Sequence, residues 1–180
     1  MASAFTHSVA ATALTVCVAR PGLPTRVWVA AVASAVLPDL DVIGFHLGIP
    51  YDSMFGHRGL THSIAFAAVW ALGLSVVLVR TGDPGLGRAR LWLLLFLSTA
   101  SHGVLDALTD RGGGVAFFAP FSAERFFLPW HQIPVSPLSI RAFFSLRGLL
   151  ILKSEILWIW VPAAAIAGTV LVVRRRRRRG

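Results

Sequence analysis

The side chains of this protein that could bind metal ions occur in short polar sequences within or beside hydrophobic stretches. All six histidines and six of the eight acidic residues have this placement. Ionisable groups at membrane depth are costly in free energy, so they usually mark a functional site. Imidazole and carboxylate groups together are typical ligands of zinc, manganese or iron. The short sequences are Thr6-His7-Ser8, Pro38-Asp39-Leu40-Asp41, His57-Arg58-Gly59-Leu60-Thr61-His62-Ser63 and Ser101-His102-Gly103-Val104-Leu105-Asp106.

His102 and Asp106 are four residues apart. On a helix this spacing places both side chains on one face, one above the other. Both could then bind one metal ion, or the carboxylate of Asp106 could bridge two ions. A structural pair of polar residues has the same spacing, so the pattern by itself leaves both interpretations open.

Asp39 and Asp41 are two residues apart, which places both carboxylates on one side only in an extended or unwound segment. Pro38 is expected to interrupt the helix there. Two carboxylates this close at membrane depth repel each other, and one takes up a proton unless a cation compensates. The pair therefore either binds a cation or consists of solvated loop residues just beyond a short helix.

Three more histidines and an arginine are candidates. His57 precedes a hydrophobic stretch, while Thr61 suits the N-cap and His62 the first turn of the helix expected there. Arg58 could neutralise a phosphate or a carboxylate. His7 alone would be an ordinary histidine on a helix, and only its position relative to the other candidates makes it a possible ligand.

The segment before the last hydrophobic stretch, residues 110–153, is rich in phenylalanine, proline and arginine. Between two membrane spans, such a segment is expected to lie among lipid headgroups rather than to stack nucleobases. Arg125 within it could hold an anionic group. Glu155 comes at the start of the last stretch, where the helix dipole favours a carboxylate. The alternative is that Glu155 acts as a general base or as a further metal ligand.

The composition indicates a membrane protein. Of the 180 residues, 56% are hydrophobic and 14% are charged, whereas ordinary globular domains carry roughly 25% charged residues. Five apolar stretches are long enough, or nearly so, to cross a bilayer, which takes about 20 residues. We therefore predict an all-α, polytopic membrane protein of one domain (1–180), with spans near residues 2–19, 27–47, 61–79, 91–108 and 155–173, an interfacial loop at 110–153 and a basic tail at 174–180.

The first hydrophobic stretch is expected to be a retained part of the protein. No Lys or Arg precedes it, so it lacks the basic start of a secretory signal. It contains the single cysteine of the chain, Cys17. One cysteine excludes an internal disulfide and any cysteine-based zinc site, so metal ligands must come from His, Asp and Glu.

The net charge of +9 is divided unequally between the two ends of the predicted spans. One side receives eleven of the 17 basic residues and the other side receives six. By the positive-inside rule the first side is cytoplasmic, which places the C-terminus inside and the N-terminus outside. The arginine run at the end of the chain is then expected to bind anionic lipids of the cytoplasmic leaflet, not nucleic acid. The eleven residues are Arg20, Arg26, Arg80, Arg88, Arg90 and Arg174–Arg179.

The candidate residues are expected to share one layer of the membrane. They come early in the first, third and fifth spans and late in the second and fourth. Because alternate spans run in opposite directions, all of them fall in the outer half of the membrane. Independent core histidines would not align in this way, so a shared site is the better explanation. These residues are His7, Asp39, Asp41, His62, His102, Asp106 and Glu155.

The motifs, in this order, resemble a bacterial family of membrane-bound metal-dependent hydrolases, the YdjM-like inner-membrane proteins. The resemblance covers nearly the whole chain, and its most specific part is the His-Arg-Gly-x-Thr-His-Ser motif. That family is held to be distantly similar to zinc-dependent phospholipase C and single-strand nucleases, which are all-helical enzymes with a zinc cluster. The resemblance continues through Pro120-Phe121-Ser122, Arg125-Phe126-Phe127 and Ser154-Glu155-Ile156-Leu157-Trp158.

The resemblance implies metal ligands in each of the polar sequences. No later His-x-x-x-Glu or His-x-x-x-Asp pair follows Asp106, so we expect one or two ions rather than a cluster of three. The implied ligands are His7, an aspartate of the Pro38-Asp39-Leu40-Asp41 sequence, His62, His102 and Asp106.

We therefore expect a hydrolase in which a divalent metal ion, with zinc favoured, lowers the pKa of bound water and polarises the scissile group. The substrate would be a phosphoester of a lipid or envelope precursor, because the site would open among lipid headgroups on the outer face. Arg58 or Arg125 would hold an anionic group, and Glu155 would orient water. The full set of expected ligands is His7, Asp39, Asp41, His57, His62, His102 and Asp106.

A non-catalytic membrane protein is the alternative, either a metal or proton conductor or a scaffold stabilised by a metal ion. A metal closed off by protein ligands favours a structural role, and an open coordination position favours catalysis. A polar path to the cytoplasmic face would favour transport, but the inner halves of the predicted spans are apolar. Binding of nucleic acid is the least expected function, and the sequence does not fix the oligomeric state.

Overall fold

The computed structural model describes residues 1–19, 22–137 and 140–179. In these ranges the chain is helical, with two isolated β-bridges and no strand. Arg20, which the charge analysis placed on the cytoplasmic side, lies outside the described residues, as does Gly180 of the basic tail. The elements are α1 (Ala4–Val18), α2 (Thr25–Val36), η1 (Leu37–Val42), α3 (Ile43–His46), η2 (Leu60–His62), α4 (Ile64–Arg80), α5 (Arg88–Ala107), α6 (Ile140–Phe143), α7 (Leu146–Glu155), η3 (Ile156–Trp160) and α8 (Val161–Arg179).

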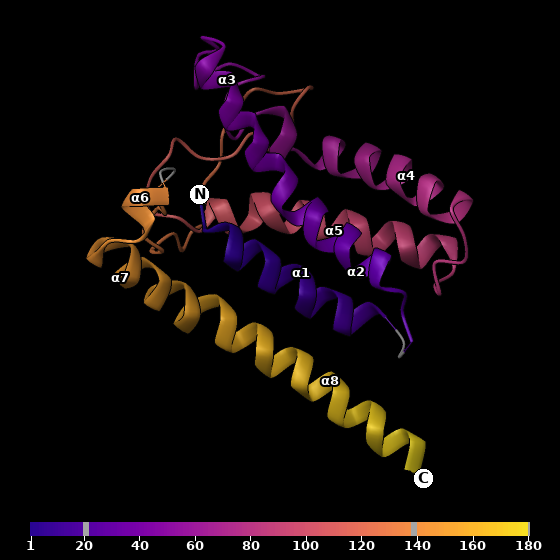
Figure 1. Cartoon of the computed structure of the whole chain (residues 1–180). Coiled ribbons are helices and arrows are strands. Elements are labelled where there is room, and N and C mark those ends of the chain that lie inside the picture. Colours follow the sequence, from indigo (N-terminus) through magenta and orange to yellow (C-terminus); the bar gives the residue numbers. More distant parts are fainter. Residues whose placement is uncertain (20–21, 138–139, 180) are drawn as a thin grey trace.

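The long helices lie side by side, with α5 at the centre. Helix α5 packs against α1, α2 and α4, while α1 also packs against α2 and α8. The start of α1, the end of α5 and the segment from α2 to α3 meet at one end of the bundle, and the C-terminus of α8 lies at the other end (Figure 1). This arrangement brings the polar sequences together, because each of them lies at the same end of its helix.

Small residues allow these helices to approach closely. The buried positions of α2 recur at helical spacing, which gives the helix one continuous packing stripe. Most of that stripe is alanine and serine, and small side chains let helix backbones come near each other. The Trp70 indole N–H of α4 donates a hydrogen bond to the Ser34 hydroxyl at 3.0 Å. The largest core cluster consists of Val27, Ala30, Ala31, Ala71, Leu78, Leu86, Leu91, Leu94 and Leu95.

Pro38 changes the helix type, as the sequence predicted. Helix α2 ends at Val36, and Leu37–Val42 form a tighter 3-10 helix with proline in its first turn. Proline has no N–H to donate and its ring clashes with the preceding turn, so the α-helix cannot continue unchanged. Asp39 is consequently carried into the interior, where it is 8% exposed.

Two predicted element boundaries differ from the structure. The last helix begins at Leu146, not at Glu155, and passes through a π-helical turn at Ile156–Trp160. The predicted loop at 110–153 is therefore helical over its last part. The N-cap of α4 is Ser63, not Thr61, because the Ser63 hydroxyl accepts the N–H of Phe66 at 3.0 Å.

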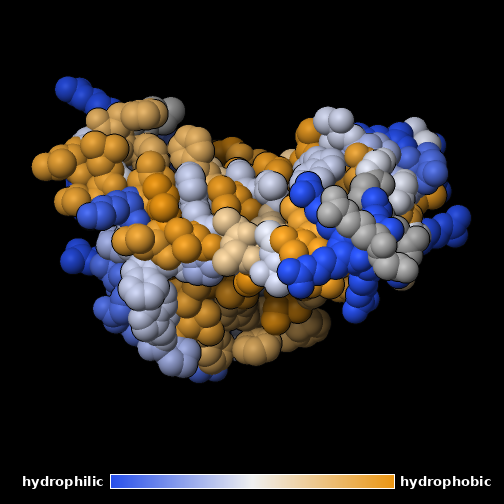
Figure 2. All heavy atoms as spheres, turned by 90° about the horizontal axis from the view of Figure 1, so that it is seen from below, coloured by the Kyte–Doolittle hydropathy of each residue, from blue (hydrophilic) through white to orange (hydrophobic). Residues whose placement is uncertain are grey.

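Two helical segments are long and apolar enough to cross a membrane, namely Thr25–His46 and Leu146–Arg178. Helices α1 and α4 are apolar but shorter, so the described structure does not by itself show the five predicted spans. Exposed apolar surface typically faces a partner or a membrane, and Figure 2 shows hydrophobic residues over much of one face, with hydrophilic residues gathered toward its two sides. Large apolar side chains exposed on the last helix are Leu149, Leu150, Leu157, Trp158, Val161, Ile166, Leu171, Val172 and Val173.

The contact between α5 and η2 depends on a glycine. A Cβ atom added at Gly103 would lie 2.8 Å from the His62 carbonyl oxygen and 3.2 Å from the Phe117 ring. We predict that Gly103→Ala lowers the free energy of unfolding by about 1–3 kcal/mol, the usual cost of overpacking. Thermal unfolding of the detergent-purified protein measures this effect.

Gly73→Ala is the matched control, because a Cβ atom at Gly73 of α4 meets nothing within 4 Å. It should leave stability unchanged or raise it slightly, since alanine is the better helix former. Equal unfolding temperatures for the two variants would show that the close approach at Gly103 is unimportant.

Candidate metal centre

Four buried side chains from three elements converge at the end of the bundle. Asp39 comes from η1, His62 from η2, and His102 and Asp106 from one face of α5. One ligand atom from each lies within 4.8 Å of the others. The Nε2 atom of His102 is 3.3 Å from Asp39 Oδ1 and 4.0 Å from Asp106 Oδ2, and the Nε2 atom of His62 is 3.6 Å from Asp106 Oδ2. We call these four residues the metal centre.

Hydrogen bonds at Nδ1 orient both imidazole rings toward the metal centre. His102 Nδ1 is 2.7 Å from the Ala35 carbonyl oxygen. His62 Nδ1 is 3.0 Å from the hydroxyl oxygen of Thr61, which donates its own proton to Asp41, and 3.2 Å from Asp41 Oδ2. All these oxygens can accept, so Nδ1–H is the donor in each case and Nε2 is left facing inward. The two Nε2 atoms are 3.0 Å apart. Nitrogen lone pairs and carboxylates at these distances repel each other unless a cation or protons lie among them.

Unpartnered carboxylate oxygens also indicate a cation. Both oxygens of Asp39 and the Oδ2 atom of Asp106 are buried without a hydrogen-bond partner among the described residues. A buried carboxylate in that condition is strongly unfavourable. Two imidazole nitrogens and two carboxylates form a donor set that suits zinc, manganese or iron. The residues present therefore fit a divalent metal ion.

Asp41 and His57 lie beside the metal centre, on the far side of the His62 ring. Asp41 Oδ2 accepts the Thr61 hydroxyl at 2.7 Å and the Arg58 N–H at 3.1 Å, and His57 Nδ1 is 2.5 Å from Asp41 Oδ1. Asp41 thus orients His62. Both residues are predicted ligands, and together with His62 they form a second group that could hold a metal ion. A 3-10 helix has three residues per turn, so Asp39 and Asp41 point in different directions and belong to different groups.

His7 lies beside the metal centre rather than within it. Its ring stacks on His102, with centroids 3.8 Å apart. Its Nε2 atom is 3.6 Å from Asp106 Oδ1, which also accepts the N–H of Ala2 at 2.7 Å. Neither ring nitrogen of His7 has a hydrogen-bond partner in the described part of the chain. Its role as a ligand stays a prediction.

Arg58 is buried against the metal centre, with 1% of its surface exposed. Its Nε atom is 3.2 Å from Asp106 Oδ2, while Nη1 and Nη2 donate to the Arg111 carbonyl and the Thr109 hydroxyl, each at 3.0 Å. The backbone of Arg58 has φ of +64°, which is uncommon for a residue other than glycine. Groups of the protein itself thus bind this guanidinium, so it is not free to bind the anionic group that the sequence predicted.

Arg125 instead holds the loop that carries His57. It donates to the carbonyl oxygens of His57 at 3.0 Å and Tyr51 at 2.8 Å. Its guanidinium carbon also lies 5.2 Å from the centre of the Tyr51 ring, a cation–π distance. These contacts fix the loop on the protein, which differs from the expected binding of an anionic group.

Glu155 caps α1. Its Oε1 atom accepts the N–H of Ser3 at 2.6 Å, and Oε2 accepts the hydroxyl groups of Ser3 and of Thr6, the latter at 2.7 Å. A carboxylate is favourable at a helix N-terminus. The expected place of Glu155 at the start of its own helix is therefore wrong, because that helix begins at Leu146; its carboxylate lies instead at the N-terminus of α1. Both oxygens are used in these bonds, so the structure gives no support for a water-orienting role.

Sequence reasoning missed Tyr51, the only tyrosine of the chain. Its ring lies edge-on to His57, with centroids 5.7 Å apart, and its hydroxyl donates to the Gly112 carbonyl. Burial raises the pKa of Tyr51, so this hydroxyl stays protonated. The only signal in the sequence was its position six residues before His57.

A small cavity of about 130 Å³ borders the metal centre. His57 and Arg58 form part of its wall and contact Asp41 and Asp106 respectively. The cavity is lined by Met1, Phe45, Tyr51, His57, Arg58, Gly112, Val135 and Ser136.

Removal of either imidazole should remove the metal. We predict that the detergent-purified protein retains a stoichiometric divalent metal ion and that His62→Ala and His102→Ala each lose most of it. Elemental analysis of the purified proteins measures this. His46→Ala is the control, because His46 is exposed at the end of α3. Metal-free wild-type protein, or equal metal in all variants, would contradict the assignment.

Asp41 should tune the site without being part of it. We predict that Asp41→Asn weakens metal affinity about 10–100-fold, the usual effect of changing a residue that orients a ligand. An amide can still accept a hydrogen bond, but it carries no charge. Competition with a coloured chelator measures the affinity, and Asp52→Asn in the exposed loop is the control. Complete loss of metal would instead make Asp41 a direct ligand.

Comparisons with known proteins identify the family of this chain. Residues 1–179 match the family described as YdjM inner membrane protein. The chain is also 41% identical to inner membrane protein YbcI of Escherichia coli strain K12 over 154 residues, which is 86% of this chain and 87% of that protein. No solved structure matches the chain. The chain therefore belongs to the YdjM family of inner membrane proteins.

Proposed function

We propose that this protein is a membrane-bound hydrolase that uses a divalent metal ion to cleave a phosphoester at the membrane surface. The proposal is carried by one observation: Asp39, His62, His102 and Asp106 meet in the interior, and three of their carboxylate oxygens have no hydrogen-bond partner among the described residues. Zinc is the ion we favour, because its usual ligands include imidazole and carboxylate.

The kind of ligand supports catalysis. Structural zinc sites are built mainly from cysteine, whereas catalytic sites combine histidine with carboxylate or water. A divalent ion held here would supply Lewis-acid chemistry, which polarises a phosphoryl oxygen and lowers the pKa of water. The sequence resemblance to metal-dependent hydrolases points to the same class of reaction.

The residues around the metal centre would set its charge and geometry. Arg58 offsets the negative charge of Asp106 at 3.2 Å. Asp41 and the Ala35 carbonyl hold the two imidazoles with Nε2 inward. The cavity beside His57 and Tyr51 is the most direct route for a substrate group. If the protein binds two ions, the second group that could hold one is Asp41, His57 and His62.

We further propose that the whole helical bundle lies in the inner membrane as five spans, with the metal centre toward the outer face and the C-terminus in the cytoplasm. The helical regions at 4–18, 25–46, 64–80 and 88–107 lie close to the first four predicted stretches, and the region at 146–179 contains the fifth. Basic residues are concentrated at the end of the bundle opposite the metal centre, which the positive-inside rule assigns to the cytoplasm. A lipid-like or envelope phosphoester would reach the site from the outer leaflet.

One observation favours a second function. The four side chains of the metal centre are at most 8% exposed, and together they could supply four ligands to one ion. Coordination entirely by protein side chains is typical of structural metal sites. In that case the protein is a scaffold whose fold requires the metal, and no reaction takes place.

Chelation separates the two functions. For a hydrolase, we predict that the purified protein cleaves a phosphodiester from a panel of soluble and lipid substrates, and that chelation abolishes this activity and added zinc restores it. Asp39→Asn should be as inactive as the chelated wild type, and His46→Ala should be fully active. Colorimetric release of the leaving group or of phosphate measures the rate.

For a scaffold, chelation would lower the unfolding temperature, because a ligand that binds only the folded state stabilises it. No hydrolysis of any substrate would accompany that shift. A protein that binds metal tightly but cleaves none of the substrates would therefore contradict the hydrolase proposal and still agree with metal binding at this centre.

A further inference from the structure

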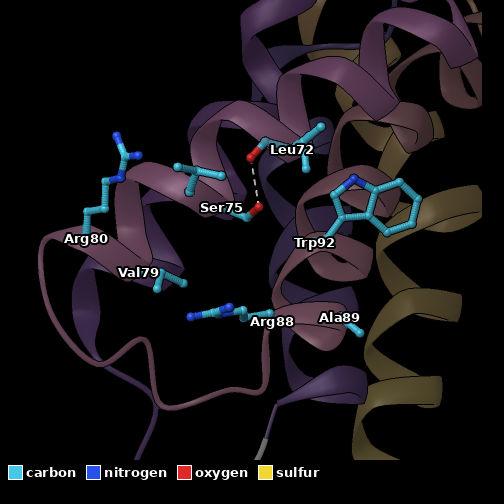
Figure 3. Close-up of a pocket in the computed structure, with 8 residues that line it drawn as sticks. Leu72, Ser75, Val79, Arg80, Arg88, Ala89 and Trp92 are labelled. Atoms are coloured by element: carbon cyan, nitrogen blue, oxygen red, sulfur yellow. Dashed lines mark hydrogen bonds between the residues drawn. The ribbon is translucent and has the colours of Figure 1, made fainter.

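A second feature lies at the opposite end of the bundle, on the edge formed by α4 and α5. It is a groove of about 460 Å³ between the last turns of α4 and the first turns of α5 (Figure 3). From Arg88 to His102 the helix rises about 21 Å at 1.5 Å per residue, so the groove is well separated from the metal centre. It is lined by Leu72, Ser75, Val76, Val79, Arg80, Arg88, Ala89 and Trp92.

The floor of the groove is apolar. The Ser75 hydroxyl donates to the Leu72 carbonyl at 2.8 Å, and the Trp92 indole N–H donates to the Ala68 carbonyl at 3.3 Å. Both donors are thus already bonded to backbone carbonyl oxygens of α4, so they are not free to bind a ligand. Leu72 is 58% exposed and Val76 is 42% exposed, so the groove opens on the outward side of α4. A hydrocarbon chain fits such a floor.

Two arginines lie at one end of this groove; in Figure 3 the Arg88 side chain extends toward Val79, and the Arg80 side chain points away from it. Arg80 ends α4 and Arg88 begins α5, and both are exposed. Among the described residues, neither guanidinium has a hydrogen bond or an ion pair. Asp83, the acidic residue of the connection, accepts the N–H of Gly85 at 2.8 Å. The end of the groove therefore carries positive charge that the protein does not neutralise.

We propose that this groove binds one anionic phospholipid. Its phosphate lies between Arg80 and Arg88, and an acyl chain follows the floor from Val79 to Trp92. Basic pockets between helices at the cytoplasmic face of a membrane favour anionic headgroups, and an acyl chain supplies the apolar partner that a free phosphate lacks. The placement at the cytoplasmic face rests on the membrane orientation proposed above, but the site does not depend on the proposed hydrolase activity, because it shares no residue with the metal centre.

Lipid titration of the detergent-purified protein tests the proposal. We expect phosphatidylglycerol to raise the unfolding temperature and to remain bound in native mass spectrometry. Phosphatidylcholine with the same chains, and inorganic phosphate alone, should do neither. Equal retention of phosphatidylcholine would show a merely apolar groove, and a response to phosphate alone would show an anion site without a lipid. Either result would overturn the proposal.

Variants then locate the site. The double variant Arg80→Gln/Arg88→Gln should bind phosphatidylglycerol at least about tenfold more weakly, given roughly 1 kcal/mol for each basic residue near anionic lipid. Arg176→Gln/Arg177→Gln removes the same charge from the C-terminal run and should bind normally. Ala89→Phe, which fills the groove without changing its charge, should also reduce binding. Retained metal content confirms folding, and equal loss in the two double variants would mean non-specific attraction.

Discussion

The structure at one end of the bundle depends on compensation of buried negative charge. Asp39, Asp106 and two inward-facing imidazole nitrogens are packed within 4.8 Å of one another. Neighbouring elements supply positive or polar partners to the outer edge of this group: the Arg58 guanidinium at 3.2 Å and the Ala2 N–H at 2.7 Å both contact Asp106. None of these partners reaches Asp39, whose two oxygens stay unpartnered among the described residues. That is the position where a cation gains the most.

Helix α1 shows how the rest of the fold is fitted to this constraint. Two residues just before it bind carboxylates on two other helices. The Ala2 N–H donates to Asp106 of α5, and the Ser3 N–H donates to Glu155 of the last helix. The Thr6 hydroxyl donates a hydrogen bond to Glu155 and accepts one from the Trp160 indole N–H, each at 2.7 Å. Both carboxylates thus lie close to the positive end of the α1 dipole. The start of α1 is therefore held between the metal centre and the last helix, and it carries His7 to the side of His102.

The sequence predicted the helices and the meeting of the polar motifs because both follow from local rules. Hydrophobic length located four of the long helices closely and the last one over part of its length, and the position of each polar motif at the same end of its helix predicted that His62, His102 and Asp106 would meet. What local rules could not supply was the direction of each side chain. Asp39 and Asp41 differ because the chain adopts a 3-10 helix. Arg58 is neutralised by groups about fifty residues away, and Glu155 caps a helix from the other end of the sequence. Long-range partners decide these roles.

The distribution of the ligands along the chain ties metal binding to folding. Asp39 and Asp106 are 67 positions apart in the sequence, so the metal centre exists only when η1, η2 and α5 are docked. An ion that binds this set adds its binding free energy to the folded state. Without an ion or added protons, the same groups repel one another. A cation bound there would therefore hold η1 and η2 against α5 in addition to apolar packing, whether or not a reaction follows.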